Sequence, residues 1–173
     1  MKKIIILIPV FNDWESLKKL LIEIENIIKN FPEIIIECFV VNDASTISKP
    51  ELRKPEKIKS LKILNMKENR GHARCNAFGI RYIIQNEKFD YLILMDGDGE
   101  DRPSELESLI KEALENPNCS VVAKRIKRSE GLFFQFLYFM HKIITYFFTG
   151  KKINFGNYTC LTKKDAEIIS SKP

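Results

Sequence analysis

The chain has 173 residues, of which 45% are hydrophobic and 29% are charged. A chain of this length and composition can bury about 70% of its unfolded surface in one core, so we expect a single globular unit. The net charge of +5 is concentrated between Cys119 and Lys152, where seven Lys and Arg residues stand against one acidic residue. Such a segment attracts phosphate groups, whether on a nucleotide, a nucleic acid or an anionic membrane.

The cysteines and the N-terminus exclude several classes of protein. Four cysteines without a C-x-x-C pair, with only two histidines, favour neither a disulfide framework nor a zinc site. They indicate a reducing, cytoplasmic location. The N-terminal apolar run contains Pro9 and ends at Asp13 and Glu15, which indicates a buried strand instead of a signal peptide. No stretch reaches the roughly 18 apolar residues of a membrane span.

Strands and helices are predicted to alternate along the chain. Ile4–Val10 is a continuous apolar run, and Leu17, Leu20, Leu21 and Ile24 then recur at helical spacing. The expected strands are 4–10, 34–43, 61–65, 91–96 and 120–124, and the expected helices are 14–30, 72–86 and 103–116. Strands that are apolar on both faces and alternate with helices predict an α/β fold, with a mainly parallel sheet flanked by helices.

Polar residues follow each predicted strand. In a parallel sheet the carboxyl ends of the strands meet at one edge, and ligands bind there. Five polar segments are therefore expected to converge: Pro9–Asp13, Asn42–Ser45, Asn69–His72, Asp96–Asp101 and Lys124–Arg125. This edge is the expected functional site.

The run YLILMDGDGEDRP passes from a predicted strand into an acidic loop. Asp96, Asp98 and Glu100 alternate along the loop, and Gly97 and Gly99 permit a tight turn that points the first two carboxylates into one space. Crowded carboxylates repel one another unless they share a cation, and hard oxygen ligands suit Mg²⁺ or Mn²⁺. We therefore expect Asp98, Asp96 and Glu100 to bind one of these ions.

The acidic loop has one alternative structure that requires no ion. Asp101 and Glu105 would complement the dipole of the following helix in a solvated helix start, and this alternative stays open. The acidic spacing also matches a calcium-binding EF-hand, but that motif needs glycine where the chain has Asp101. The chain also lacks the glycine-rich phosphate loops of dehydrogenases and P-loop enzymes.

Four short motifs carry a resemblance to a known family: IPVFND, VNDAS, NRGHARCNAFG and MDGDGEDRP. In this order and spacing they resemble the motifs of family 2 glycosyltransferases, which have the GT-A fold. The resemblance runs from Ile8 to about Leu161 and is strongest to the branch that includes dolichyl-phosphate mannose synthase and bacterial polyprenyl-phosphate sugar transferases. VVAKRIKRSEG and FGNYTCLTKKDA are also similar to the segments that close the site in that branch.

The resemblance implies a nucleotide-sugar site built from the first motifs. Its nucleobase and ribose pocket would be lined by Pro9, Val10, Phe11 and Asp13, and Asp43 would hydrogen-bond the base. Without the resemblance, the same residues would be assigned to a strand end and a turn.

The later motifs are implied to hold the diphosphate and the sugar. Gly71, His72 and Arg74 would lie near the diphosphate at the start of a helix. Asp96, with Gly97 beside it, would contact the ribose or the sugar.

The implied catalytic residues are Asp96, Asp98, Glu100 and Arg125. Asp98 would bind the metal, and Glu100 would assist it. Arg125, together with Lys124, would meet the donor diphosphate or an acceptor phosphate.

The implied reaction is an inverting, metal-dependent transfer from a nucleoside-diphosphate sugar. The cation would neutralise the charge that builds on the leaving phosphate. An acceptor phosphate, such as a polyprenyl phosphate, needs no general base, whereas a hydroxyl acceptor does. Because no residue has to be a base, a phosphate acceptor is favoured. A glycan or other hydroxyl acceptor, and a catalytically silent sugar-nucleotide or lipid-binding module, stay open.

No nucleic-acid partner is expected. The basic segment lacks the interleaved surface aromatics of known nucleic-acid-binding modules. Its phosphate ligand is then expected to be a nucleotide or a lipid.

Residues 132–148 hold eight of the 18 aromatic residues and are predicted to form an amphipathic helix. This helix either lies in a membrane interface and brings a lipid-linked acceptor to the site, or packs against the sheet. Thr159 stands where several lipid-phosphate sugar transferases carry arginine, which counts against the lipid-phosphate assignment.

We expect residues 1–130 to form the catalytic core and residues 131–173 to form a segment that closes the site. The resemblance further implies a C-terminal continuation, often with membrane helices. The expected location is the cytoplasm or the inner face of the cell membrane.

Overall fold

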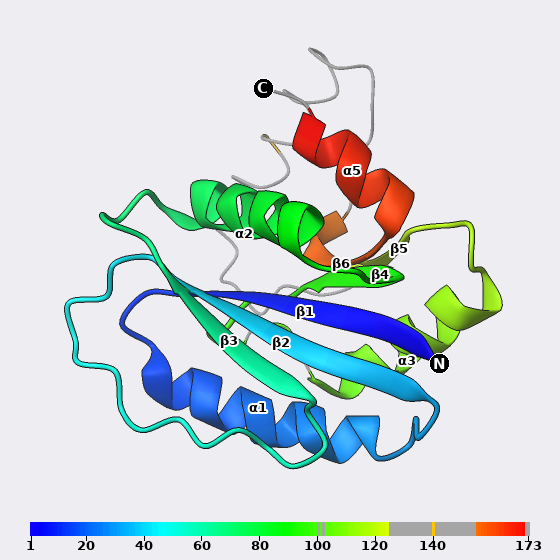
Figure 1. Cartoon of the computed structure of the whole chain (residues 1–173), viewed down its shortest axis with the longest axis horizontal. Helices are drawn as coiled ribbons and strands as arrows, with labels where there is room; N and C mark the ends of the chain where they lie inside the picture. Colours follow the sequence, from blue (N-terminus) through cyan, green and yellow to red (C-terminus); the bar gives the residue numbers. More distant parts are fainter. Residues whose placement is uncertain (100, 102, 125–139, 141–154, 172–173) are drawn as a thin grey trace.

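The computed structural model describes residues 1–99, 101, 103–124, 140 and 155–171. A central sheet lies between two layers of helices (Figure 1). The elements in chain order are β1 (Lys2–Val10), α1 (Trp14–Ile28), β2 (Ile34–Asn42), β3 (Ser60–Asn65), α2 (His72–Asn86), β4 (Tyr91–Leu94), α3 (Pro103–Glu115), β5 (Val121–Lys124), β6 (Phe155–Thr162) and α5 (Lys163–Ser171).

The sheet is mainly parallel, as the sequence predicts. Its strand order is β3-β2-β1-β4-β6-β5, and β1 to β4 pair in parallel. β6 pairs antiparallel with both β4 and β5, so β5 runs in the same direction as the first four strands. The carboxyl ends of all five predicted strands therefore lie at the same edge of the sheet.

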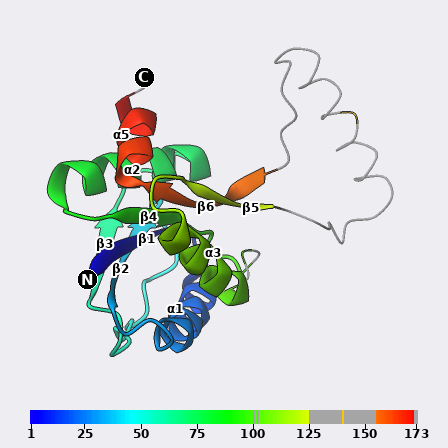
Figure 2. The ribbon, with the colours of Figure 1, turned by 90° about the vertical axis from the view of Figure 1, so that its right-hand side faces the viewer.

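The two faces of the sheet bury separate apolar clusters. Ile4, Ile6 and Ile8 of β1 face α1 and α3, whereas the alternating residues Ile5 and Leu7 face α2 and α5. Figure 2 shows the helix pairs on opposite sides of the sheet. This arrangement explains why β1 is apolar at every position from Ile4 to Val10: a strand that is covered on both sides has no solvent face.

Most predicted elements form, with small shifts at their ends. The helix predicted at 72–86 has those bounds in the structure, and β4 ends at Leu94, two residues before its predicted end. β6 and α5 were not among the predicted elements.

The C-terminal expectations are only partly covered by the structure. The predicted amphipathic helix at 132–148 lies outside the described residues, apart from Met140. The division of the chain at residue 131 stays a prediction; the structure places β6 in the same sheet as β1 to β4. No helix in the described part of the chain is long and apolar enough to cross a membrane.

Close packing of α2 on the sheet provides a test of the fold. A Cβ added at Gly79 would lie 2.5 Å from Leu7 Cδ1 and 3.0 Å from Val41 Cγ2. Both neighbours are fully buried, so Gly79→Ala should lower the free energy of unfolding by about 1–3 kcal/mol, measured by urea denaturation. At an uncrowded helical position the same change would raise stability by about 1 kcal/mol. A stabilising effect would therefore contradict the close approach of α2 to β1.

Candidate active site

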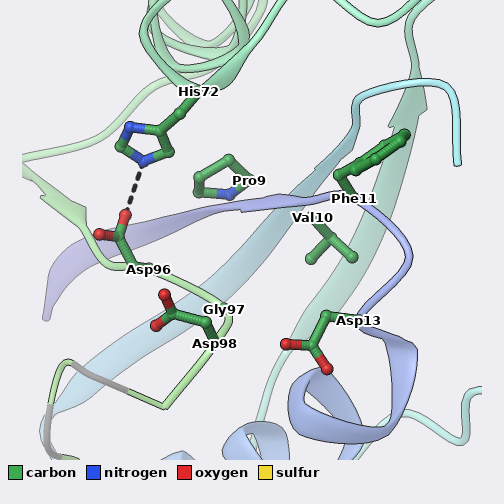
Figure 3. A pocket seen from close by; sticks show the side chains of 8 residues that line it. All are labelled: Pro9, Val10, Phe11, Asp13, His72, Asp96, Gly97 and Asp98. Atoms are coloured by element: carbon green, nitrogen blue, oxygen red, sulfur yellow. Dashed lines mark hydrogen bonds and ion pairs between the residues drawn. The ribbon is translucent and has the colours of Figure 1, made fainter.

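A cleft of about 290 Å³ opens at the carboxyl edge of the sheet. Figure 3 shows that β1 with its following loop forms one side, the loop after β4 the other, and the start of α2 overhangs both. The lining residues are Pro9, Val10, Phe11, Asp13, His72, Asp96, Gly97 and Asp98. Two of the predicted motifs, IPVFND and MDGD, therefore lie on facing walls of one cleft.

The wall from β1 combines apolar and acidic groups. Val10 is buried and anchors the strand end, whereas the Phe11 ring is 46% exposed. Asp13 is at the N-cap position of α1 but makes no side-chain cap hydrogen bond, and its carboxylate lines the cleft. An exposed ring beside a carboxylate offers a surface for stacking and hydrogen bonding of a planar polar ligand.

The acidic loop is fixed to β1 by close packing. Met95 donates its backbone N–H to Leu7 O at 3.1 Å, and Asp96 donates its own to Asp101 Oδ2 at 2.8 Å. A Cβ at Gly97 would lie 3.1 Å from Pro9 O, so the loop approaches β1 more closely than most side chains allow. Gly99 has φ +87°, a left-handed conformation that favours glycine. The backbone thereby places the Asp96 and Asp98 side chains at the cleft.

His72 links α2 to the acidic loop. Its Nε2 lies 2.7 Å from Asp96 Oδ1 and 3.0 Å from Asn76 Nδ2. One oxygen of Asp96 is thus oriented by α2 (Figure 3).

Asp43 is not among the residues that line the cleft. The residue is buried, with 3% of its surface exposed. Its carboxylate accepts the backbone N–H groups of Arg70 at 2.9 Å and Gly71 at 2.8 Å. Gly71 has φ +81° and precedes the first residue of α2, His72. Asp43 therefore fixes the turn from which His72 reaches into the cleft.

Two buried groups near the site keep their protons. Burial, with a smaller contribution from Asp101 and Glu105, raises the pKa of Tyr158 on β6 far above its usual range. Burial and Asp43 raise the pKa of the Cys75 thiol to about 12. Neither group is a nucleophile or a proton acceptor at neutral pH.

A family comparison decides what kind of domain carries this cleft. The family described as Glycosyl transferase family 2 matches residues 5–166, which include both walls of the cleft. The chain belongs to glycosyl transferase family 2. Its mainly parallel sheet flanked by helices is the GT-A fold of that family.

Individual relatives of this family 2 chain are distant. An uncharacterised protein of Methanocaldococcus jannaschii, MJ0544, is 31% identical over 122 residues, which are 68% of this chain and 49% of that protein. The chain thus spans about half the length of this curated relative.

Solved structures of glycosyltransferases share the fold. The mannosyltransferase PcManGT from Pyrobaculum calidifontis, in complex with GDP-Man and Mn²⁺, has a TM-score of 0.55 at 17% identity and covers 98% of this chain and 47% of its own. Residues 1–349 of S. aureus TarS, in complex with UDP-GlcNAc, give a TM-score of 0.54 at 17% identity, over 76% of this chain and 37% of that TarS fragment. At 17% identity, the similarity to these structures shows a shared fold.

The predicted metal ligands of this family 2 domain are partly covered by the structure. Asp96 and Asp98 both line the cleft, whereas Glu100 lies outside the described residues. Among the residues that the structure describes, no three His, Cys, Asp or Glu side chains form a ready-made metal site. Mg²⁺ is usually held by one or two carboxylates together with substrate phosphates, so two carboxylates at an open cleft fit an ion that arrives with a diphosphate.

The remaining predicted site residues divide into two groups. Pro9, Val10, Phe11, Asp13 and Gly97 line the cleft with the two aspartates. Asp43, Gly71 and Arg74 do not line it: the first two shape the turn before α2, and Arg74 is exposed on α2. Arg125 lies outside the described residues, directly after the end of β5 at Lys124.

Sequence reasoning missed two polar contacts that hold the site together. Asp101, expected to complement a helix dipole, is 8% exposed and accepts the Asp96 amide. Asn12, which follows the end of β1, binds the loop after β2. An acidic loop followed by a buried carboxylate leaves no distinct pattern, and an Asn next to a strand end is equally typical of a helix cap.

Proposed function

We propose that the chain is the nucleotide-sugar-binding and catalytic part of an inverting glycosyltransferase that uses a nucleoside-diphosphate sugar. The observation that carries this proposal is the cleft, in which the Phe11 and Asp13 wall faces Asp96 and Asp98. Family membership of residues 5–166 supports the same reaction class. The donor's base and ribose would lie on the β1 wall, and its diphosphate between the acidic loop and the start of α2.

The acidic loop supplies the electrostatic part of the reaction. A divalent cation, Mg²⁺ or Mn²⁺, when bound to Asp98 with Asp96 and Glu100, neutralises the negative charge that develops on the leaving diphosphate. Asp96, oriented by His72 and Asp101, holds the ribose or the sugar. Lys124, the last residue of β5, and Arg125, which follows it in the sequence, would share the charge of the departing phosphate in this proposal. The PcManGT complex with GDP-Man and Mn²⁺ supports it by analogy.

The acceptor proposed is a phosphate, such as a polyprenyl phosphate at the inner face of a membrane. A phosphate oxygen is ionised at neutral pH and attacks without a general base. A hydroxyl acceptor is the alternative, and a comparison of undecaprenyl phosphate with soluble glycans as acceptors for the same donor separates the two.

Coupled binding of metal and nucleotide tests the proposed function. Mn²⁺ and one of UDP or GDP, added together at about 100 times the dissociation constant, should stabilise the fold by about 2.7 kcal/mol. For a domain of this size that corresponds to a rise in Tm of about 5–10 °C, measured by thermal denaturation. Each component alone should give much less, because two carboxylates are too few ligands for the ion, and without the ion they repel the negatively charged diphosphate. Equal shifts with and without Mn²⁺ would contradict a metal-linked site.

A further inference from the structure

Asn12 ties the loop after β1 to the loop after β2. Its Oδ1 accepts the backbone N–H groups of Thr46 at 2.8 Å and Ile47 at 3.0 Å, and its Nδ2 donates to Thr46 Oγ1 at 3.0 Å. Its own backbone N–H donates to Ser45 Oγ at 2.9 Å. The amide side chain of Asn12 is thus occupied on both its oxygen and its nitrogen by one neighbouring loop.

The backbone around these contacts is held in an unusual conformation. Asn12 has φ +61° and Ala44 has φ +56°, and they are the two non-glycine residues with positive φ in the described part of the chain. An L-residue in the left-handed region costs on the order of 1–2 kcal/mol, least for Asn and more for Ala. Such conformations persist where surrounding contacts enforce them, and they cluster at functional sites.

Further hydrogen bonds extend the contact across the sheet edge. Trp14 Nε1 donates to Ile47 O at 3.2 Å, Ser45 donates its N–H to Asn42 Oδ1 at 2.9 Å, and Asn42 Nδ2 donates to Asn65 Oδ1 at 2.9 Å. The ends of β1, β2 and β3 are thereby joined through side-chain amides. The loop at 45–47 is fixed to β2 on one side and to the start of α1 on the other.

Asn12 itself is not among the residues that line the cleft, but its two chain neighbours are. Phe11 and Asp13 flank it and both face the cleft (Figure 3). Because a single peptide unit separates Asn12 from each of them, the backbone angles of Asn12 set the relative direction of the Phe11 ring and the Asp13 carboxylate.

We propose that Asn12 is a positioning residue, which holds Phe11 and Asp13 in the arrangement that receives the nucleoside of the donor. This inference rests on the proposed function, because it assigns the β1 wall to a nucleotide. A wall ordered during folding loses little conformational freedom on binding, and the ligand then binds more tightly. Asn12 acts on donor affinity and not on the reacting bond, since none of its described contacts involves the acidic loop.

Two substitutions separate the side-chain contacts from the backbone conformation. Asn12→Gly keeps access to positive φ but removes the amide, whereas Asn12→Asp keeps an oxygen for Thr46 and Ile47. In Asn12→Gly, amide hydrogen exchange at Thr46 and Ile47 should be at least about tenfold faster. The dissociation constants for UDP or GDP with Mn²⁺, and KM for the donor, should rise about tenfold, with kcat changed less than about threefold. In Asn12→Asp, the exchange rates and the nucleotide affinity should both stay close to the wild-type values.

The hydrogen bonds from the Asn12 side chain to Thr46 and Ile47 form what we call the clamp. The outcomes distinguish a failure of this clamp from a failure of the proposed function. Asn116→Gly is the control, because it removes two side-chain hydrogen bonds at the end of α3, and nucleotide affinity should not change. Faster exchange with unchanged affinity in Asn12→Gly would overturn the positioning role, and unchanged exchange would overturn the clamp itself. A wild-type protein that binds neither UDP nor GDP would overturn the proposed function, whereas exchange at Thr46 and Ile47 would still decide whether the clamp exists.

Discussion

Asp98→Asn should lower the metal-dependent hydrolysis or transfer of the sugar nucleotide by about 10²–10³-fold. Asp98 lines the cleft from the glycine turn, and its carboxylate is the ligand that we assign to the cation. An amide has nearly the same shape but lacks the negative charge, so the ion is held weakly and the leaving diphosphate is no longer neutralised. The measurement is donor turnover as a function of Mn²⁺ concentration.

The loss should concern activity and not folding. The Asp98 side chain is exposed, and exposed substitutions usually change stability by no more than about 0.5 kcal/mol, so Tm should stay within about 2 °C of the wild type. Glu115→Gln, which removes an exposed carboxylate from the far end of α3, is the control and should retain full turnover. An Asp98→Asn protein with full metal-dependent turnover would remove the metal role from this residue.

Asp96 is held from two sides of the acidic loop. It is fixed through its backbone by Asp101 and through its side chain by His72. A fixed carboxylate orients a ligand, which supports the proposed contact of Asp96 with the ribose or the sugar. Asp98 follows between Gly97 and Gly99, and its exposed side chain lines the cleft, where an ion that arrives with a diphosphate can reach it.

The sequence was sufficient to predict the part of the fold that depends on local patterns. A continuous apolar run predicted β1, and helical spacing predicted α1 to within two residues of its end. β6 was missed because its place between β4 and β5 depends on pairing with residues more than 30 positions away. Its sequence, FGNYTCLT, has too few consecutive apolar residues to indicate a buried strand without that pairing.

The candidate site was predictable to a similar depth. The rule that parallel strands end at one edge predicts that Phe11, Asp13, Asp96 and Asp98 lie close together. The rule does not say which polar groups face the cleft and which hold the loops, because both kinds follow a strand directly. Asp43 shows the difference: its contact with the base stays a prediction, and the structure adds that its carboxylate accepts two backbone N–H groups.

Asp43→Asn should weaken both the fold and nucleotide binding. Asparagine has one oxygen to accept from Arg70 or Gly71, and its NH₂ group then opposes the second backbone N–H. A buried N–H left without an acceptor costs about 1–3 kcal/mol, which corresponds to a Tm lower by about 3–10 °C. The turn before α2 loosens, His72 no longer holds Asp96 in place, and the dissociation constant for UDP or GDP with Mn²⁺ should rise at least about tenfold.

A second carboxylate of the same kind separates loss of stability from loss of the site. Asp90 accepts the backbone N–H of Lys3 at 2.8 Å and the Lys2 ammonium at 3.0 Å, and it lies at the opposite end of β1 from the cleft. Asp90→Asn should lower Tm in the same direction but leave nucleotide affinity unchanged, since no cleft residue depends on it. If Asp43→Asn lowered Tm and bound nucleotide as the wild type does, the turn held by Asp43 would not control the cleft. Nucleotide binding at the β1 wall would then be independent of α2, and His72 would have no role in it.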